Sequence, residues 1–210
     1  MITIVIADDH AVVRRGLKEI LADEHDMEIG AEASTAQELL DLIRKRPWDA
    51  VVLDISLPGR SGLEVLAELK QEQPTLPVLV HTMHPEDQFA RRALRAGASG
   101  YLTKDSAPTE LVKALRKIVA GGKYVGASLA EKLAASMDAK TVEAPHQALS
   151  DREFEVFRLL ASGKTVSEIA DQLSLSVKTV STYRSRILHK MKMKNNAELM
   201  RYALQQKVVE

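Results

Sequence analysis

The chain has 210 residues, enough for one large domain or two small ones. Its content of 45% hydrophobic and 28% charged residues is typical of a globular protein and excludes a disordered one. The absence of cysteine excludes disulfides and thiolate metal sites, and no apolar run approaches the length of a membrane span. We therefore expect a cytoplasmic protein without a membrane partner.

The charge is distributed unevenly although the formal net charge is zero. Residues 1–125 carry a net charge of −3, and residues 150–210 carry +4. Six basic residues and no acidic residue fall within 176–194. Such a run is often only a solvated helix face, but the asymmetry between the halves favours two domains and an anionic partner for the second.

Short apolar, β-branched runs alternate with helical patterns over the first 122 residues. The predicted strands are Ile2–Ala7, Glu28–Ala33, Ala50–Leu53, Val78–His81 and Gly100–Thr103. The predicted helices are His10–Ala22, Ala36–Arg46, Gly62–Gln71, Pro85–Ala96 and Pro108–Ala120. Five strands, each followed by a helix, predict a doubly wound α/β domain, (βα)5, with a parallel sheet.

The pattern changes after Gly122. Ser128–Met137 predicts a short helix, and Asp138–Ala148 is polar and contains a proline, as linkers often do. From Ser150 onward every pattern is helical. We expect a first domain at 1–122, a linker with a short helix at 123–147, and an all-α four-helix domain at 148–210.

Capping residues mark the helix starts of this second domain. Ser150–Glu153 and Thr165–Glu168 both have the spacing of a capping box. Ser176 is expected to cap a helix that ends near Met191, and Asn196 to cap the last one, which ends near Gln206.

Polar and charged residues follow the strands of the first domain. Asp8 and Asp9 end the first strand, Asp54 the third, Thr82 the fourth and Lys104 the fifth. These ends share one edge of a parallel sheet, where ligands bind. Crowded carboxylates are tolerable around a divalent cation, and oxygen donors favour Mg²⁺. One such aspartate is more often a helix cap, but the whole set favours a phosphoryl-transfer site with Asp54 as nucleophile.

These residues, with the runs Val51–Pro58 and Tyr101–Lys104, resemble the receiver domain of two-component response regulators. The resemblance covers residues 1–122 and implies a flavodoxin-like (CheY-like) fold in which Asp54 is the phosphoacceptor. It implies Mg²⁺ bound by Asp9 and Asp54, by Asp8 through water and by the backbone carbonyl of Ser56. It also implies that Lys104 and Thr82 contact the phosphoryl group and that Tyr101 changes rotamer.

Three further positions lie near this edge. Asp105 follows Lys104 where many receivers have proline, so a cis-proline bend is not assumed. His84 either reaches the mouth of the site and influences dephosphorylation or is an ordinary loop residue. His81 points to the opposite face from Thr82, because strand side chains alternate, and we expect a core histidine with satisfied hydrogen bonds.

The second domain has the proportions of a helix-turn-helix. A short helix, Val166–Leu173, is followed by a three-residue turn and a longer basic helix. On the long helix, Val180, Ile187 and Met191 form an apolar stripe that should face the core. The opposite side should enter the major groove of DNA.

The runs Leu149–Glu153, Ile169–Leu173, Ser176–Val180 and Ala197–Leu199 are similar to the LuxR-type helix-turn-helix. The whole chain resembles the NarL/FixJ-type response regulators. The resemblance implies base contacts by Ser181, Thr182 and Ser185, which Lys178 could join. It implies phosphate contacts by Thr179, Arg184 and Lys190.

The resemblance implies a transcription regulator rather than an enzyme. A sensor histidine kinase would phosphorylate Asp54 and promote homodimer binding to double-stranded promoter DNA, with the last helix as dimer contact and RNA polymerase as a further partner. One alternative is an aspartyl-phosphate phosphatase, although Ser56 stands where such enzymes usually have a second carboxylate. Others are a regulator that works without phosphate, and a helical protein–protein module in the second domain.

Overall fold

The structure, a computed structural model, describes residues 1–126, 129–131 and 144–209. The chain divides into two compact units, Met1–Met137 and Asp138–Glu210. Most of the predicted helix Ser128–Met137 lies outside the described residues, and the domain boundaries at 122 and 148 stay predictions. Within the described part of the chain, no helix combines the length and the apolar character that a membrane span requires.

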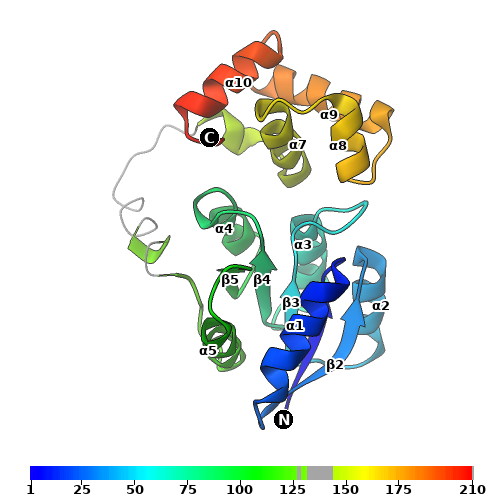
Figure 1. Cartoon of the computed structure of the whole chain (residues 1–210), viewed down its shortest axis with the longest axis vertical. Helices are drawn as coiled ribbons and strands as arrows, with labels where there is room; N and C mark the ends of the chain where they lie inside the picture. Colours follow the sequence, from blue (N-terminus) through cyan, green and yellow to red (C-terminus); the bar gives the residue numbers. More distant parts are fainter. Residues whose placement is uncertain (127–128, 132–143, 210) are drawn as a thin grey trace. The chain divides into compact units, whose positions relative to one another are not determined.

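The first unit is a parallel sheet of five strands in the order β2-β1-β3-β4-β5, with helices between successive strands (Figure 1). The strands are β1 (Ile2–Ala7), β2 (Met27–Ala33), β3 (Ala50–Leu53), β4 (Val78–Thr82) and β5 (Gly100–Thr103). The helices are α1 (Ala11–Ala22), α2 (Ala36–Lys45), α3 (Gly62–Glu72), α4 (Glu86–Arg95) and α5 (Pro108–Val119). The doubly wound (βα)5 prediction is confirmed.

Apolar side chains are buried on both faces of this sheet. On one face, Ile4 and Leu79 pack in a single cluster with Leu17 of α1 and Leu115 of α5. Residues that point the other way, such as Val80, are equally buried, and α2, α3 and α4 supply further buried side chains. A sheet covered on both faces explains why its strands are continuous apolar runs rather than alternating ones.

The first residues of the predicted linker lie against the edge of the sheet. The backbone N–H of Tyr124 donates to the carbonyl of Ser99 at 2.9 Å, and the N–H of Tyr101 donates to the carbonyl of Tyr124 at 3.0 Å. These bonds form a parallel bridge beside β5. The folded part of the first unit therefore continues beyond Gly122.

Over residues 144–209, the second unit contains a short 3₁₀ helix followed by four α-helices. They are η1 (Pro145–Ala148), α7 (Asp151–Ala161), α8 (Val166–Gln172), α9 (Val177–Lys190) and α10 (Asn196–Gln205). Ser150 and Thr165 both form the predicted capping boxes, and Ser176 caps α9. The prediction for α10 was wrong by one residue, because the Asn195 side chain accepts the N–H of Glu198 at 3.0 Å.

Two helix glycines of the first unit should respond in opposite ways to alanine. A Cβ at Gly62 would lie 2.3 Å from the carbonyl oxygen of Asp54, whereas a Cβ at Gly16 would meet nothing within 4 Å. We expect Gly62→Ala to destabilise the fold by about 1–3 kcal/mol, and Gly16→Ala to stabilise it by about 0.5–1 kcal/mol. Urea unfolding measures both. Equal changes in the unfolding free energy for the two substitutions would show that the space around Gly62 and Gly16 does not differ as described.

Candidate functional site

The backbone of the parallel sheet positions the acidic residues and the lysine at its carboxyl edge. The N–H of Asp54 donates to the carbonyl of Ala7 at 2.8 Å, which extends the pairing of β1 with β3. The N–H of Lys104 likewise donates to the carbonyl of Thr82 at 2.9 Å and extends the pairing of β4 with β5. The residues that follow these strands are therefore held by ladder hydrogen bonds rather than by loop conformation.

The ammonium group of Lys104 bridges two carboxylates. Its Nζ lies 2.6 Å from Oδ2 of Asp8 and 2.7 Å from Oδ2 of Asp54. All three side chains are almost fully buried, with exposed fractions of 7% for the lysine and 2% for each aspartate. Removing charges from water is unfavourable, so this cluster depends on mutual neutralisation.

The titration behaviour of the bridge reflects both burial and charge. Burial raises the pKa of Asp8, the Asp54 charge adds to that effect, and the hydrogen bond from Lys104 offsets only part of it. Burial alone would lower the pKa of Lys104, but the two carboxylates raise it above its ordinary value. The lysine therefore stays cationic at neutral pH, which keeps a positive charge beside Asp54.

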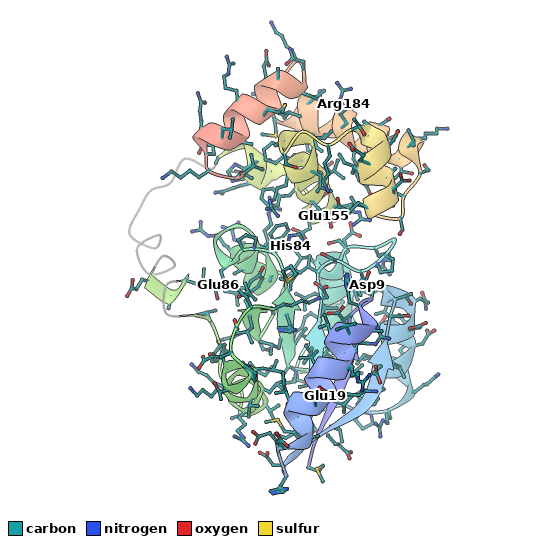
Figure 2. The ribbon with its side chains drawn as sticks, viewed as in Figure 1. Asp9, Glu19, His84, Glu86, Glu155 and Arg184 are labelled. Carbon is teal, nitrogen blue, oxygen red and sulfur yellow. The ribbon has the colours of Figure 1, made fainter. Side chains whose placement is uncertain are left out.

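An acidic cluster opens from this bridge toward solvent. Ligand atoms of Asp8, Asp9, His10 and Asp54 lie within 4.8 Å of one another. His10 is mostly exposed, and its Nδ1 lies 2.6 Å from Oδ1 of Asp9. Figure 2 shows Asp9 at the same end of the first unit as His84, while Glu19 lies farther along α1. Three carboxylates gathered at one point are oxygen donors of the kind that a hard divalent cation takes.

His84, in the loop after β4, forms hydrogen bonds with three other residues of the predicted site. The backbone N–H of His84 reaches Oγ1 of the buried Thr82 at 3.5 Å, and its carbonyl accepts the hydroxyl of Tyr101 at 2.9 Å. Its ring nitrogen Nε2 lies 3.0 Å from Oγ of Ser56, whose N–H donates to Oδ1 of Asp54 at 3.2 Å. His84 therefore contacts residues of the predicted site, and an influence of its ring on dephosphorylation stays a prediction.

Two other expectations have definite outcomes. His81 is buried, but its Nδ1 has no hydrogen-bond partner among the described residues, so the prediction of a satisfied core histidine was wrong. Strand alternation predicts the face of the sheet on which a side chain lies, but it does not predict which hydrogen-bond partners are present there. No cis peptide bond occurs among the described residues, Asp105 included.

In the second unit, the long helix α9 has a buried and an exposed side. Val180 and Ile187 are fully buried, as predicted. The predicted base-contacting residues share the exposed side at spacings of three and four, and they are Lys178, Ser181, Thr182 and Ser185. This side can therefore approach the floor of a groove without unpacking the helix.

The predicted phosphate contacts are engaged within the domain. Oγ1 of Thr179 lies 2.7 Å from Oγ of Ser176, and Nε of Arg184, labelled in Figure 2, donates to Oδ1 of Asn196 at 2.7 Å. Nζ of Lys190 lies 2.6 Å from Oε2 of the buried Glu153. The ion pair ties α9 to the start of α7, a structural task that the spacing along α9 alone did not indicate.

Comparison with known proteins identifies the two units. Residues 4–116 match the response regulator receiver domain, and residues 147–203 match the luxR family of bacterial regulatory proteins. The chain belongs to the response regulator family. Its two matched regions are those of the NarL/FixJ type, as the sequence motifs predicted.

Relatives of this response regulator match it over nearly its whole length. Response regulator GacA of Pseudomonas aeruginosa is 36% identical, with 100% of this chain and 99% of that protein covered. Response regulator UvrY of Escherichia coli is 34% identical, covering 97% and 94%. The structure of RcsB from Salmonella enterica serovar Typhimurium bound to promoter rprA with phosphomimetic BeF3⁻ has a TM-score of 0.65 at 29% identity, covering 96% and 98%. The two curated relatives are named as response regulators, and the RcsB structure is that of a response regulator bound to promoter DNA.

The Glu153–Lys190 pair should make the stability of this response regulator sensitive to acid. Burial works to raise the pKa of Glu153, but the hydrogen bonds from Lys190 and Ser150 outweigh it and leave the pKa below its ordinary value. The stabilisation is therefore complete above the unfolded-state pKa of about 4.3 and is lost as the pH falls through the folded-state pKa. Glu153→Gln should flatten the pH dependence of the unfolding free energy below about pH 4.3.

Urea unfolding monitored between about pH 3 and pH 7 measures this dependence. Asp171→Asn, which alters an exposed acid of α8, is the control. An unchanged slope in Glu153→Gln would show that the ion pair does not contribute.

Proposed function

We propose that this response regulator controls transcription by accepting a phosphoryl group on Asp54 and then binding promoter DNA as a homodimer. The observation that carries the proposal is the Lys104 ammonium held between the buried carboxylates of Asp8 and Asp54. A fixed cation beside a carboxylate stabilises the charge that develops during phosphoryl transfer.

The reaction needs no group from the protein other than a nucleophile and fixed charges. A carboxylate oxygen of Asp54 attacks the phosphorus of a phosphohistidine on a sensor histidine kinase. The new P–O bond forms while the P–N bond breaks, and the leaving imidazole takes a proton from solvent. The product is an acyl phosphate on Asp54.

The donor set fits Mg²⁺. Asp9 and Asp54 would ligate the ion directly, Asp8 through water, and Ser56 through its backbone carbonyl. When bound, the ion supplies positive charge that neutralises the phosphoryl oxygens. The carboxylates that would hold it are already gathered within the 4.8 Å cluster.

Phosphorylation would change the partners of Lys104 and Thr82. The phosphoryl oxygens offer acceptors to the Lys104 ammonium and to the Thr82 hydroxyl that the free carboxylate lacks, and this difference between two states is what shifts a population. Movement of Thr82 would disturb its contact with the loop at His84, which also accepts the Tyr101 hydroxyl. The rotamer of Tyr101 would then report the state of Asp54.

DNA binding would use the exposed side of α9, with Ser181, Thr182 and Ser185 at base edges and Lys178 beside them. Phosphate contacts would come from three other residues of α9, which are Thr179, Arg184 and Lys190. Each would have to share its present partner inside the domain with a phosphate oxygen. Met200 and Leu204, one turn apart on α10, are exposed apolar residues that suit a homodimer contact. The promoter-bound dimer would work with RNA polymerase, in the cytoplasm.

Asp54→Asn tests the phosphoacceptor. The amide keeps the shape of the side chain but is not a nucleophile, so incubation with acetyl phosphate and Mg²⁺ should add a phosphoryl group to the parent and none to the variant. Intact-mass spectrometry measures the modification. Asp23→Asn, which alters an exposed acid at the end of α1, should be modified like the parent. Modification of Asp54→Asn at the parental rate would refute the assignment.

Lys178→Ala tests the DNA-binding surface. On a duplex of arbitrary sequence, where no base is recognised, Lys178 would pair with a phosphate instead, so its loss should reduce the magnitude of the negative slope of log K against log salt by about 0.9. Fluorescence anisotropy at several salt concentrations measures the slope. Lys190→Ala should instead lower the thermal midpoint, because it leaves Glu153 buried without its cation. A parental slope in Lys178→Ala would remove this residue from the interface.

A further inference from the structure

The hydroxyl groups on the exposed side of α9 are not equivalent. Oγ1 of Thr182 donates to the backbone carbonyl of Lys178 at 2.9 Å. Oγ of Ser185 donates in the same way to the backbone carbonyl of Ser181 at 3.1 Å. Both bonds run four residues back along the helix, an arrangement that serine and threonine adopt within helices. The hydroxyl of Ser181 forms no hydrogen bond within the described part of the chain.

These bonds determine what the two hydroxyls offer to a ligand. A hydroxyl has one hydrogen to donate and two lone pairs that accept. The hydrogens of Thr182 and Ser185 are already bound to carbonyls of their own helix. The oxygen lone pairs are what these side chains present to the outside, so both positions act as hydrogen-bond acceptors.

The lone pairs of both residues are accessible from the same side of the helix. Thr182 and Ser185 are exposed and three positions apart, which places them on one face of α9. Over residues 144–209, neither hydroxyl bonds to another side chain. Val180 and Ile187 are fully buried on the other side of the helix and fix its orientation.

The base edges in the major groove of DNA carry both donors and acceptors. The donors are the exocyclic amino groups, N6 of adenine and N4 of cytosine. The keto oxygens, O6 of guanine and O4 of thymine, are acceptors. Each base pair has one amino and one keto group there, so a protein group that only accepts distinguishes one strand of the pair from the other.

We propose that Thr182 and Ser185 read DNA as acceptors, each taking a hydrogen bond from the amino group of an adenine or a cytosine in the major groove. The inference rests on the proposed function, because it gives the chemistry of base contacts made by α9. Ser181 is not restricted in this way, since its hydrogen is not bound within the helix.

The preference for an amino group follows from the number of hydrogen bonds in each complex. Accepting from an amino group adds one bond and keeps the bond within the helix. Donating to a keto oxygen requires the hydroxyl to leave its carbonyl, so one bond is exchanged for another. The two complexes differ by one hydrogen bond, which corresponds to about fivefold in affinity.

Selection from a pool of random DNA duplexes locates the contacts. The full chain, with acetyl phosphate and Mg²⁺, should enrich a defined sequence. Thr182→Val replaces the hydroxyl by a methyl group, and Ser185→Ala removes it. The base pair at which each variant loses its preference is the pair that the residue contacts. Preferences that survive unchanged in both variants overturn the proposal.

Base analogues in the enriched duplex determine the direction of the hydrogen bond. Purine in place of adenine, or 2-pyrimidinone in place of cytosine, deletes the amino group of the contacted pair. In the same pair, 5-methyl-2-pyrimidinone in place of thymine, or 2-aminopurine in place of guanine, deletes the keto oxygen. Fluorescence anisotropy measures the affinity of each combination of protein and duplex, which completes a double-mutant cycle.

Deletion of the amino group should weaken binding by the parent about fivefold more than binding by Thr182→Val. Deletion of the keto oxygen should weaken both proteins alike. Ser185→Ala should show the same pattern at its own base pair. A cycle in which the keto oxygen, and not the amino group, is coupled to the hydroxyl overturns the proposal.

Thr182→Ser is the matched control. It keeps the hydroxyl and loses the methyl group, so its dependence on the amino group should equal that of the parent. Circular dichroism at the temperature of the binding experiment checks that each variant is folded. Loss of the amino dependence in a folded Thr182→Ser would assign the effect to the methyl group and overturn the proposal.

Failure of the proposed function has a different result. A parent that enriches no sequence, with or without acetyl phosphate, fails as a regulator of specific promoters and takes this inference with it. A parent that enriches a sequence but whose cycles respond to the keto oxygen loses this inference alone. Enrichment that does not need acetyl phosphate removes the role of Asp54 and leaves the base contacts to be judged by their own cycles.

Discussion

The structure of the receiver unit depends on one buried electrostatic arrangement, a lysine ammonium between two aspartates. Asp8 follows β1, Asp54 follows β3, and Lys104 follows β5. The lysine therefore joins the end of β5 to the ends of two strands that are not its neighbours in the sheet. Each of these charges would be unfavourable in this place without the others, so any chemistry that alters one carboxylate must rearrange the lysine. The acidic cluster contains both of these carboxylates, so it would change together with the position of the lysine.

Most of the fold could be predicted because its determinants are local. Strands buried on both faces produce continuous apolar runs, and serine or threonine caps with a glutamate three residues later produce the starts of α7 and α8. The convergence of Asp8, Asp54 and Lys104 followed from topology alone, since the ends of parallel strands share an edge. Asn195 was missed because two adjacent asparagines are equally good caps, and only the backbone conformation distinguishes them.

What escaped prediction depends on pairs of side chains that are distant in sequence. Lys190 is 37 positions from Glu153, and no periodicity along α9 indicates that partner. His84 contacts Ser56, which follows β3, and Tyr101, which lies within β5, and neither contact can be read from the sequence around His84. The unpartnered Nδ1 of His81 is likewise set by the side chains packed around the ring, which the position of His81 in β4 does not reveal. Alternation along a strand predicts the direction of a side chain but not the residues that surround it in the folded protein.

The close approach of Gly62 to the backbone of Asp54 has a mechanical consequence. The N–H of Gly62 donates to the carbonyl of Ile55 at 2.8 Å, and there is no room for even a methyl group between α3 and this turn. The β3 side of the acidic edge is thus stiff, because backbone rests directly on backbone. The β4 side is instead held by hydrogen bonds between the His84 loop and the side chains of Thr82 and Tyr101. If Asp54 is phosphorylated as proposed, we therefore expect the resulting displacement on the β4 side, because α3 leaves no space on the β3 side.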